Sequence, residues 1–264
     1  MLTIPSRIRA PSASLAVLCA LAAPGCYLAH ERGDDAGPVD AGRPPLDGAA
    51  APSLVWVLVH PADAPRGPGL YLFDEARQEL LRQLPLPDGV TSPHALAWDG
   101  RSLWLGGVDV EPAVREIDPE SGRVLSRWSG VVTEGIAVTD GTFWYAGVTN
   151  AFVPLVHVGR DGTTLDSLPL PEAAVQDLVS ARGALFYLVN DGEDRIVRLD
   201  PSSGAAADLA RGVDAAPNAL GFDGSALAVA VDQRIRRFDP ESGALVSERP
   251  FAVPGWITAI AFVR

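Results

Sequence analysis

Apolar and polar residues alternate along many short segments between residue 53 and the end of the chain. The runs 113–118 and 123–128 show this alternation, and 94–98 and 102–108 are mostly apolar. A two-residue period places successive side chains on opposite faces of a β-strand. The pattern therefore predicts four short strands between residues 94 and 128.

The same arrangement recurs along the chain. The turn pairs Asp99-Gly100, Asp140-Gly141, Arg182-Gly183 and Asp223-Gly224 have their glycines 41, 42 and 41 residues apart. A second turn marker repeats at nearly the same interval, in "DPESG", "GRDG", "DPSSG" and "DPESG", and ends on glycine at Gly122, Gly162, Gly204 and Gly243. A period just above forty with four strands per unit is typical of β-propeller blades.

The number of second strands sets the number of blades. These strands are expected to begin near Leu54, Leu103, Thr142, Ala184 and Ser225. The first unit has no innermost strand of its own, and the last segment, 256–264, has the sequence of one. We therefore predict an all-β fold, a five-bladed β-propeller over residues 53–264 with four-stranded antiparallel blades. The C-terminal strand is expected to close the first blade, and six blades are the alternative count.

The N-terminal residues 1–25 have the pattern of an export signal. Arg7 and Arg9 precede the apolar run "LAVLCALAA", which is too short to span a bilayer as a helix. The run ends in Ala23-Pro24-Gly25-Cys26, which resembles the bacterial lipobox and implies a lipid on Cys26. Ordinary secretion is the alternative. Residues 26–52 are rich in Gly, Pro, Ala and Asp, which predicts a flexible tether similar to those of myxobacterial lipoproteins.

Charge and cysteine content narrow the choice of partners and chemistry. The formal net charge is −12, and removing Arg7 and Arg9 with the signal would make it −14. A chain this acidic repels nucleic acid. It also lacks the positive charge that would attract it to anionic lipids, so we expect contact with a membrane only through the lipid on Cys26. The two cysteines, Cys19 and Cys26, would leave the folded part without a thiol. We expect a monomer in the bacterial cell envelope, without a cofactor or metal.

A ring of polar residues is the main candidate site. The expected innermost strands align on an apolar residue, and the residue two places earlier is polar in all five: His94, Glu134, Gln176, Asn218 and Thr258. With a two-residue period, each polar side chain should share a face with its apolar partner, nearer the start of the strand. We expect these residues to surround one mouth of the central channel, with Trp256 as an aromatic ligand contact.

Several functions are open for this ring. It could hydrate the channel, bind a ligand, or catalyse a reaction, whereas His94 and Glu134 alone are too few ligands for a metal site. The acidic segment 190–194 is expected to be a solvated turn, with calcium binding as the alternative. The loops 61–69 and 149–154 are candidates for contacts with a protein partner.

Two stretches resemble a known enzyme family. "PHAL" at 93–96 and "TEGI" at 133–136 occur in the order of two blade starts in five-bladed glutaminyl cyclotransferases of the plant and bacterial type. In that family the residue matching Glu134 belongs to the active site, and Asn218 is a second match. His94 and the strands "LWLGG" and "FWYAG" depart from the family. The resemblance implies cyclisation of an N-terminal glutamine, with Glu134 as the proton shuttle.

More broadly, the repeats resemble those of β-propeller lipoproteins of the bacterial envelope. We therefore expect a lipid-anchored module that binds a ligand or protein through the channel mouth and its loops. The alternative is the cyclotransferase-like enzyme, and a lactonase-like metal enzyme ranks below both, because only Glu134 and Asn218 are suitably placed.

Overall fold

The computed structural model describes residues 54–61, 68–147, 154–170, 175–213, 218–231 and 233–263. These residues form twenty strands and no helix. Within the same ranges, nothing helical is long and apolar enough to cross a membrane. The predicted signal segment, Cys26 and the tether lie outside the described residues, so they stay predictions.

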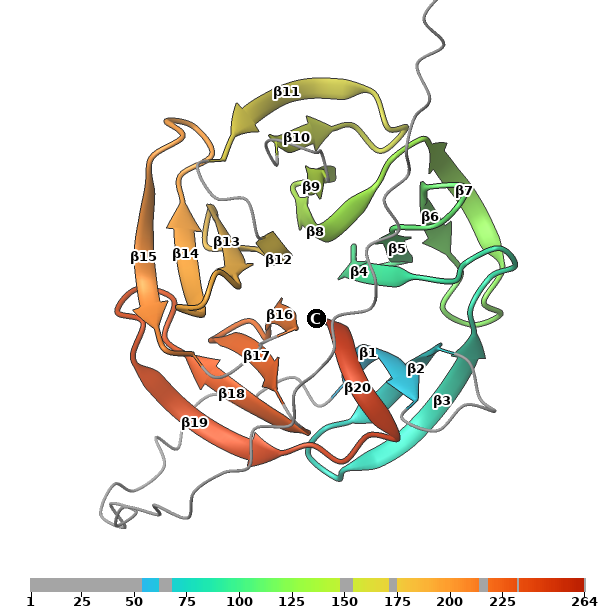
Figure 1. The fold of residues 1–264 in the computed structure, drawn as a ribbon. Helices are drawn as coiled ribbons and strands as arrows, with labels where there is room; N and C mark the ends of the chain where they lie inside the picture. Colours follow the sequence, from blue (N-terminus) through green and yellow to red (C-terminus); the bar gives the residue numbers. More distant parts are fainter. Residues whose placement is uncertain are drawn as a thin grey trace, which may run out of the picture. The chain divides into compact units, whose positions relative to one another are not determined.

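The strands form five separate four-stranded sheets arranged around a central axis (Figure 1). This is a five-bladed β-propeller, as the repeat predicted. The blades contain, from the innermost strand outwards: β20 (Gly255–Phe262), β1 (Leu54–Pro61), β2 (Gly69–Asp74), β3 (Glu79–Pro85); β4 (Pro93–Trp98), β5 (Leu103–Gly107), β6 (Ala113–Ile117), β7 (Val124–Ser129); β8 (Thr133–Thr139), β9 (Thr142–Gly147), β10 (Pro154–Val158), β11 (Thr164–Pro169); β12 (Val175–Ala181), β13 (Ala184–Val189), β14 (Arg195–Leu199), β15 (Ala206–Arg211); β16 (Ala219–Phe222), β17 (Leu227–Val231), β18 (Arg234–Phe238), β19 (Leu245–Pro250).

The C-terminal strand closes the ring, which confirms the prediction from residues 256–264. Strand β20 pairs antiparallel with β1 along its length, from Val55 opposite Phe262 to Pro61 opposite Gly255. The amide of Val263 also donates to the carbonyl of Leu54 at 3.1 Å. Blade 1 is therefore built from both ends of the domain, and no innermost strand is left without a partner in its sheet.

The tight turns have the backbone conformations that their sequences favour. Asp140 and Gly141 have φ values of 47° and 79°, and Arg182 and Gly183 have 50° and 76°. Positive φ at both central residues is the requirement of a two-residue type I′ hairpin. These turns join the first two strands of blades 3 and 4, where the repeated turn pairs predicted them.

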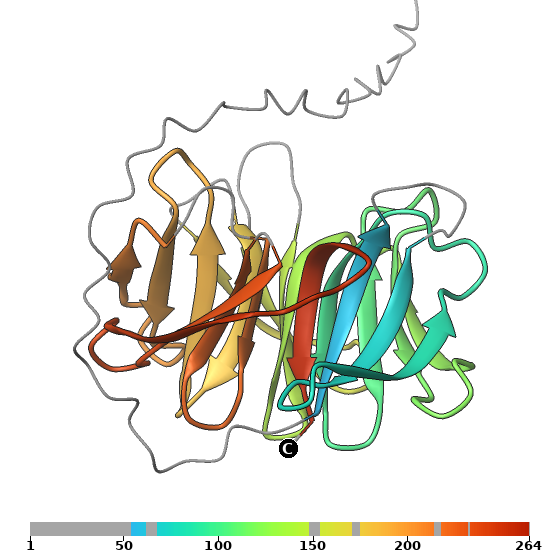
Figure 2. The same cartoon turned by 90° about the horizontal axis from the view of Figure 1, so that it is seen from below.

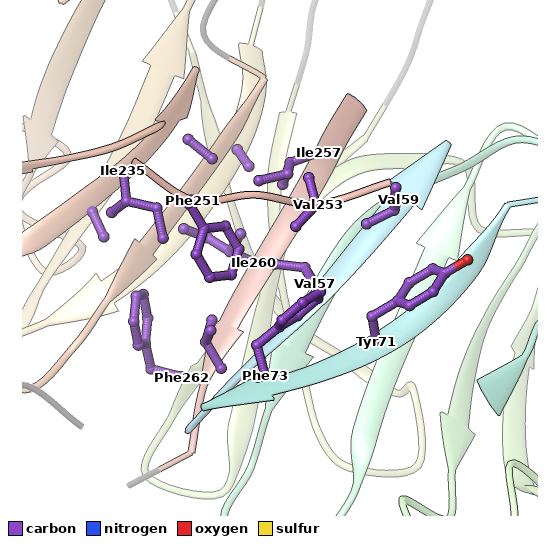
Figure 3. Close-up of a cluster of buried hydrophobic side chains, with 14 residues drawn as sticks. Val57, Val59, Tyr71, Phe73, Ile235, Phe251, Val253, Ile257, Ile260 and Phe262 are labelled. Atoms are coloured by element: carbon purple, nitrogen blue, oxygen red, sulfur yellow. The ribbon is translucent and has the colours of Figure 1, made fainter. Parts of the chain in front are cut away.

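The core consists of five clusters of buried side chains, one between each pair of neighbouring blades. Figure 3 shows the cluster that joins blade 5 to blade 1, where Phe73 and Phe251 meet edge to face at 5.2 Å. Trp104 is fully buried in the cluster between blades 2 and 3, with its ring 4.4 Å from that of Phe143. Trp104 therefore packs between blades and offers no ring face to a ligand.

Candidate functional site: the mouth of the central channel

The five innermost strands start at one end of the central channel, which we call the mouth, and run to the opposite end (Figures 1 and 2). The five aligned polar residues lie at or next to the strand starts, and all are partly exposed: His94, Glu134, Gln176, Asn218 and Thr258. The apolar residues two places later are all buried: Leu96, Ile136, Leu178, Leu220 and Ile260. The polar ring therefore lies on the mouth side of an apolar ring.

A register shift occurs where four of these polar residues lie. In β4 the pairing skips from Pro93 to Ala95, so His94 is the extra residue of a β-bulge. The same shift occurs at Glu134 and Gln176, and at Thr258 in β20. Asn218 directly precedes β16. At these four positions a bulge interrupts the two-residue alternation on which the expectation of a shared face rests, so the shared face stays a prediction.

His94 and Glu134 meet directly across blades 2 and 3. Nδ1 of His94 lies 3.3 Å from Oε2 of Glu134, and the side chains are 38% and 25% exposed. The other imidazole nitrogen, Nε2, lies 3.0 Å from the hydroxyl of Ser92. An imidazole between a hydroxyl and a carboxyl group is held in one orientation, so the pair can pass or share a proton.

Blade 1 contributes a second histidine and an exposed tryptophan to the mouth. Nε2 of His60 lies 3.4 Å from the carbonyl oxygen of Pro93, the residue before His94. His60 is paired in register with Trp256, whose side chain is 64% exposed. The hydroxyl of Thr258 donates to the carbonyl of Leu58 at 3.4 Å. The aromatic contact predicted at Trp256 is therefore available to solvent beside the polar ring.

Asp177 is a residue that we did not predict. It follows Gln176 in β12, is fully buried, and accepts backbone N–H groups with both carboxyl oxygens. The sequence held a signal for it in the position just before the aligned apolar residues. There the five blades have Ala95, Gly135, Asp177, Ala219 and Ala259, so a single carboxyl group replaces a small residue.

Burial alters the acidity of both carboxyl groups. It raises the pKa of Glu134, and the positive charge of a protonated His94 opposes that rise. Burial also raises the pKa of Asp177 well above its usual range, outweighing the two backbone hydrogen bonds, and the negative charge of Glu134 raises it further. Burial lowers the pKa of His60. The mouth therefore favours neutral forms of its titratable groups.

Replacing His94 by glutamine should raise the pKa of Glu134, because the nearby positive charge that favours the carboxylate is removed. Glu134 would then stay protonated to a higher pH than in the parent protein. A side-chain carboxyl NMR titration of ¹³C-labelled protein measures this. His157→Gln, on β10 and stacked on Trp144, is the control that should leave Glu134 unchanged. An equal or lower pKa in His94→Gln would contradict the pairing.

The other candidates from the sequence, the segment 190–194 and the loops 61–69 and 149–154, add no described residue to this site. In the segment 190–194, Asp191 pairs with Arg195 at 2.6 Å and Glu193 pairs with Arg211 at 2.5 Å, so this turn is bound by arginines. Across the described ranges, no group of three or more His, Cys, Asp or Glu residues could hold a metal ion. The candidate loops 61–69 and 149–154 lie mostly outside the described residues.

A cavity of about 400 Å³ occupies the opposite end of the channel. It is lined by the far ends of the innermost strands and by their turns, including Leu96, Trp98, Ser180, Phe222 and Phe262. The apolar ring forms its inner wall, so it lies on the other side of that ring from Glu134. The proton-bearing groups are thus concentrated at the mouth.

No protein-family model matches the chain, and no curated protein matches its sequence. Solved structures share the fold at low identity. One chain of a nidogen/laminin complex is 12% identical with a TM-score of 0.51, over 79% of this chain and 97% of that one. Glutaminyl cyclase from Myxococcus xanthus is 14% identical with a TM-score of 0.51, over 70% and 75%.

TolB from Acinetobacter baumannii is 16% identical with a TM-score of 0.51, and the match covers 73% of this chain and about half (51%) of TolB. At such identities the likeness concerns the fold alone. A shared fold does not by itself set the function.

Proposed function

We propose that this protein is a lipid-anchored β-propeller of the bacterial envelope that binds a small ligand or peptide end carrying an amine at the channel mouth. Glu134 binds the amine through its carboxyl group. His94 holds the Glu134 side chain in place, and its positive charge favours the ionised carboxylate. Trp256 covers the ligand from blade 1, while Gln176, Asn218 and Thr258 offer neutral hydrogen-bonding groups. The export signal and the lipid on Cys26 come from the sequence pattern alone.

The observation that carries this proposal is the contact between His94 and Glu134 at 3.3 Å within a ring of polar side chains. A partly buried carboxyl group gains most from an ammonium group that replaces the lost water contacts. An exposed tryptophan at the same mouth favours a cation as well, because its ring face attracts positive charge. Both features favour an amine over an anionic ligand.

A binding experiment with defined peptides tests the proposal. Peptides with a free N-terminus should bind the full chain, and the same peptides with an acetylated N-terminus should bind at least ~10-fold more weakly, a difference of about 1.4 kcal/mol. Glu134→Gln should remove this preference. Glu120→Gln, in a turn at the other end of blade 2, is the matched control that should bind as the parent does. Calorimetry showing equal binding of free and acetylated peptides would refute the amine site.

A second candidate is cyclisation of an N-terminal glutamine, favoured by the burial of Glu134 and by the fold shared with a glutaminyl cyclase. The α-amine nitrogen would attack the side-chain amide carbon, and the C–N bond to the amide nitrogen would break to release ammonia. Glu134 would take the proton from the attacking amine and give it to the leaving nitrogen. A raised pKa suits a carboxyl group that must both accept and donate a proton near neutral pH.

Mass spectrometry of glutamine-initiated peptides separates the two candidates. An enzyme should release ammonia above the spontaneous rate, and Glu134→Gln should slow this by roughly 100-fold or more. If the full chain binds these peptides without converting them, the mouth is a binding site.

A further inference from the structure

Asp177 occupies a position where every other blade has a small residue. The equivalent residues are Ala95, Gly135, Ala219 and Ala259. Strand β12 therefore places a carboxyl group where the other innermost strands have at most a methyl group. Since burying a carboxyl group is costly, this position must have specific partners.

The partners of Asp177 join two blades. Oδ1 accepts the backbone N–H of Leu178 at 2.8 Å, and Oδ2 accepts that of Leu220 in blade 5 at 2.7 Å. A small side chain at this position could make neither bond. Asp177 thus links β12 to β16 at the level of the apolar ring and is itself held in one orientation.

The strand that carries Glu134 touches Asp177 directly. A Cβ atom built on Gly135, the residue after Glu134, would lie 2.5 Å from the nitrogen of Leu178 and 2.9 Å from the Cα of Asp177. Only glycine lets the two strands approach so closely. Glu134 and Asp177 therefore belong to neighbouring strands whose backbones meet here, and the negative charge of Glu134 raises the pKa of Asp177.

Few other charges reach this pair. Among the described residues, His94 on β4 lies against Glu134, and His60 on β1 lies on the far side of β4, near the carbonyl of Pro93. Strand β13, which pairs with β12, contributes the buried phenol Tyr187, and the described part of β16 contains no ionisable side chain. No arginine or lysine among these elements offsets two negative charges.

We propose that Glu134 and Asp177 form a carboxyl pair that holds one proton at neutral pH, with Asp177 as a positioning residue for Glu134. One fully buried and one partly buried carboxyl group do not both ionise when only a histidine lies beside them, because the charges repel each other in a poorly solvated site. If the mouth binds an amine as proposed above, this carboxyl pair also selects the ligand. An ammonium group supplies the missing positive charge, so its binding lets both groups ionise and releases the shared proton to solvent.

The first experiment tests whether the ligand-free full chain holds the shared proton. In a ¹³C NMR titration, Asp177 should ionise about one pH unit lower or more in Glu134→Gln than in the parent, because the negative charge of Glu134 raises the pKa of Asp177. Asp140→Asn, in the hairpin after β8, is the matched control and should leave Asp177 unchanged. An unchanged titration of Asp177 in folded Glu134→Gln would overturn the pair.

Infrared spectroscopy gives a second measurement of the shared proton. The infrared band of a protonated carboxylic acid should persist at neutral pH in the parent, and in Glu134→Gln the remaining acid should ionise at lower pH. An acid band that titrates identically in both proteins would also overturn the pair. Since neither measurement includes a ligand, failure of peptide binding with these shifts intact would contradict the proposed function alone.

Proton release tests the selection of an amine. Calorimetry in two buffers of different ionisation enthalpy should show close to one proton released when a peptide with a free N-terminus binds the parent. Asp177→Ala should bind the peptide with little release. Equal proton release by the parent and the variant would remove Asp177 from the site.

Discussion

Replacing Arg237 by alanine is expected to lower the free energy of unfolding by about 3–5 kcal/mol. Arg237 is almost fully buried on β18 and joins blade 5 to blade 1. Its Nε donates to Asp223 at 2.7 Å, and its Nη2 donates to both carboxyl oxygens of Glu75 at 2.7 and 2.6 Å. Without the guanidinium, two buried carboxylates would stay unpaired at the interface where the ring closes.

Arg234 provides the control on the same strand. It pairs with Glu248 at 2.9 Å, but its side chain is about half exposed, so Arg234→Ala should cost less than about 1 kcal/mol. Urea denaturation of both variants gives the comparison. Equal losses would mean that burial does not decide how much these ion pairs stabilise the fold, and that Arg237 does not hold the ring closed.

Replacing Gly135 by alanine is expected to destabilise the protein by roughly 1–3 kcal/mol and to disturb the mouth. The new methyl group would lie 2.5 Å from the backbone nitrogen of Leu178, closer than atoms of this kind approach. Backbone cannot move aside as a flexible side chain can, so β8 and β12 would have to separate. Glu134, the residue before Gly135, would move with β8 and lose its position near Asp177.

Gly147→Ala is the matched control in the same blade. Gly147 ends β9 and is paired with Thr133 of β8. A Cβ atom on Gly147 would find its nearest atoms at ordinary contact distances of 3.6–3.7 Å. Thermal unfolding should show a much smaller change than for Gly135→Ala. If the two variants lose the same stability, the close approach of β8 and β12 is not a constraint on the fold.

The fold could be predicted because each blade repeats its own turn chemistry. Asp-Gly pairs and the Asp-Pro-x-Ser-Gly turns recur at a nearly constant interval and require backbone conformations that few other residues adopt. The missing first strand and the extra last one indicated the closure between β1 and β20. These signals are local, and they do not depend on how side chains pack.

The site could be predicted only in part. Alignment of the blades identified the polar ring, but not the bulges, because a one-residue register shift leaves no mark in a short strand. These bulges lie at His94, Glu134, Gln176 and Thr258. Asp177 was missed because one acidic residue in a mostly apolar strand resembles any turn or edge residue. Its importance depends on Leu220, 43 residues away, and such contacts are set by the closed ring.

The most direct test of the amine site is an NMR titration of the full chain with a peptide that has a free N-terminus. The six indole N–H signals and the imidazole signals report on both ends of the channel. We predict shifts at Trp256 and His94, no shift at Trp98 beside the opposite cavity, and loss of these shifts in Glu134→Gln. Shifts confined to Trp98, or shifts that persist in Glu134→Gln, would contradict a binding site at the mouth.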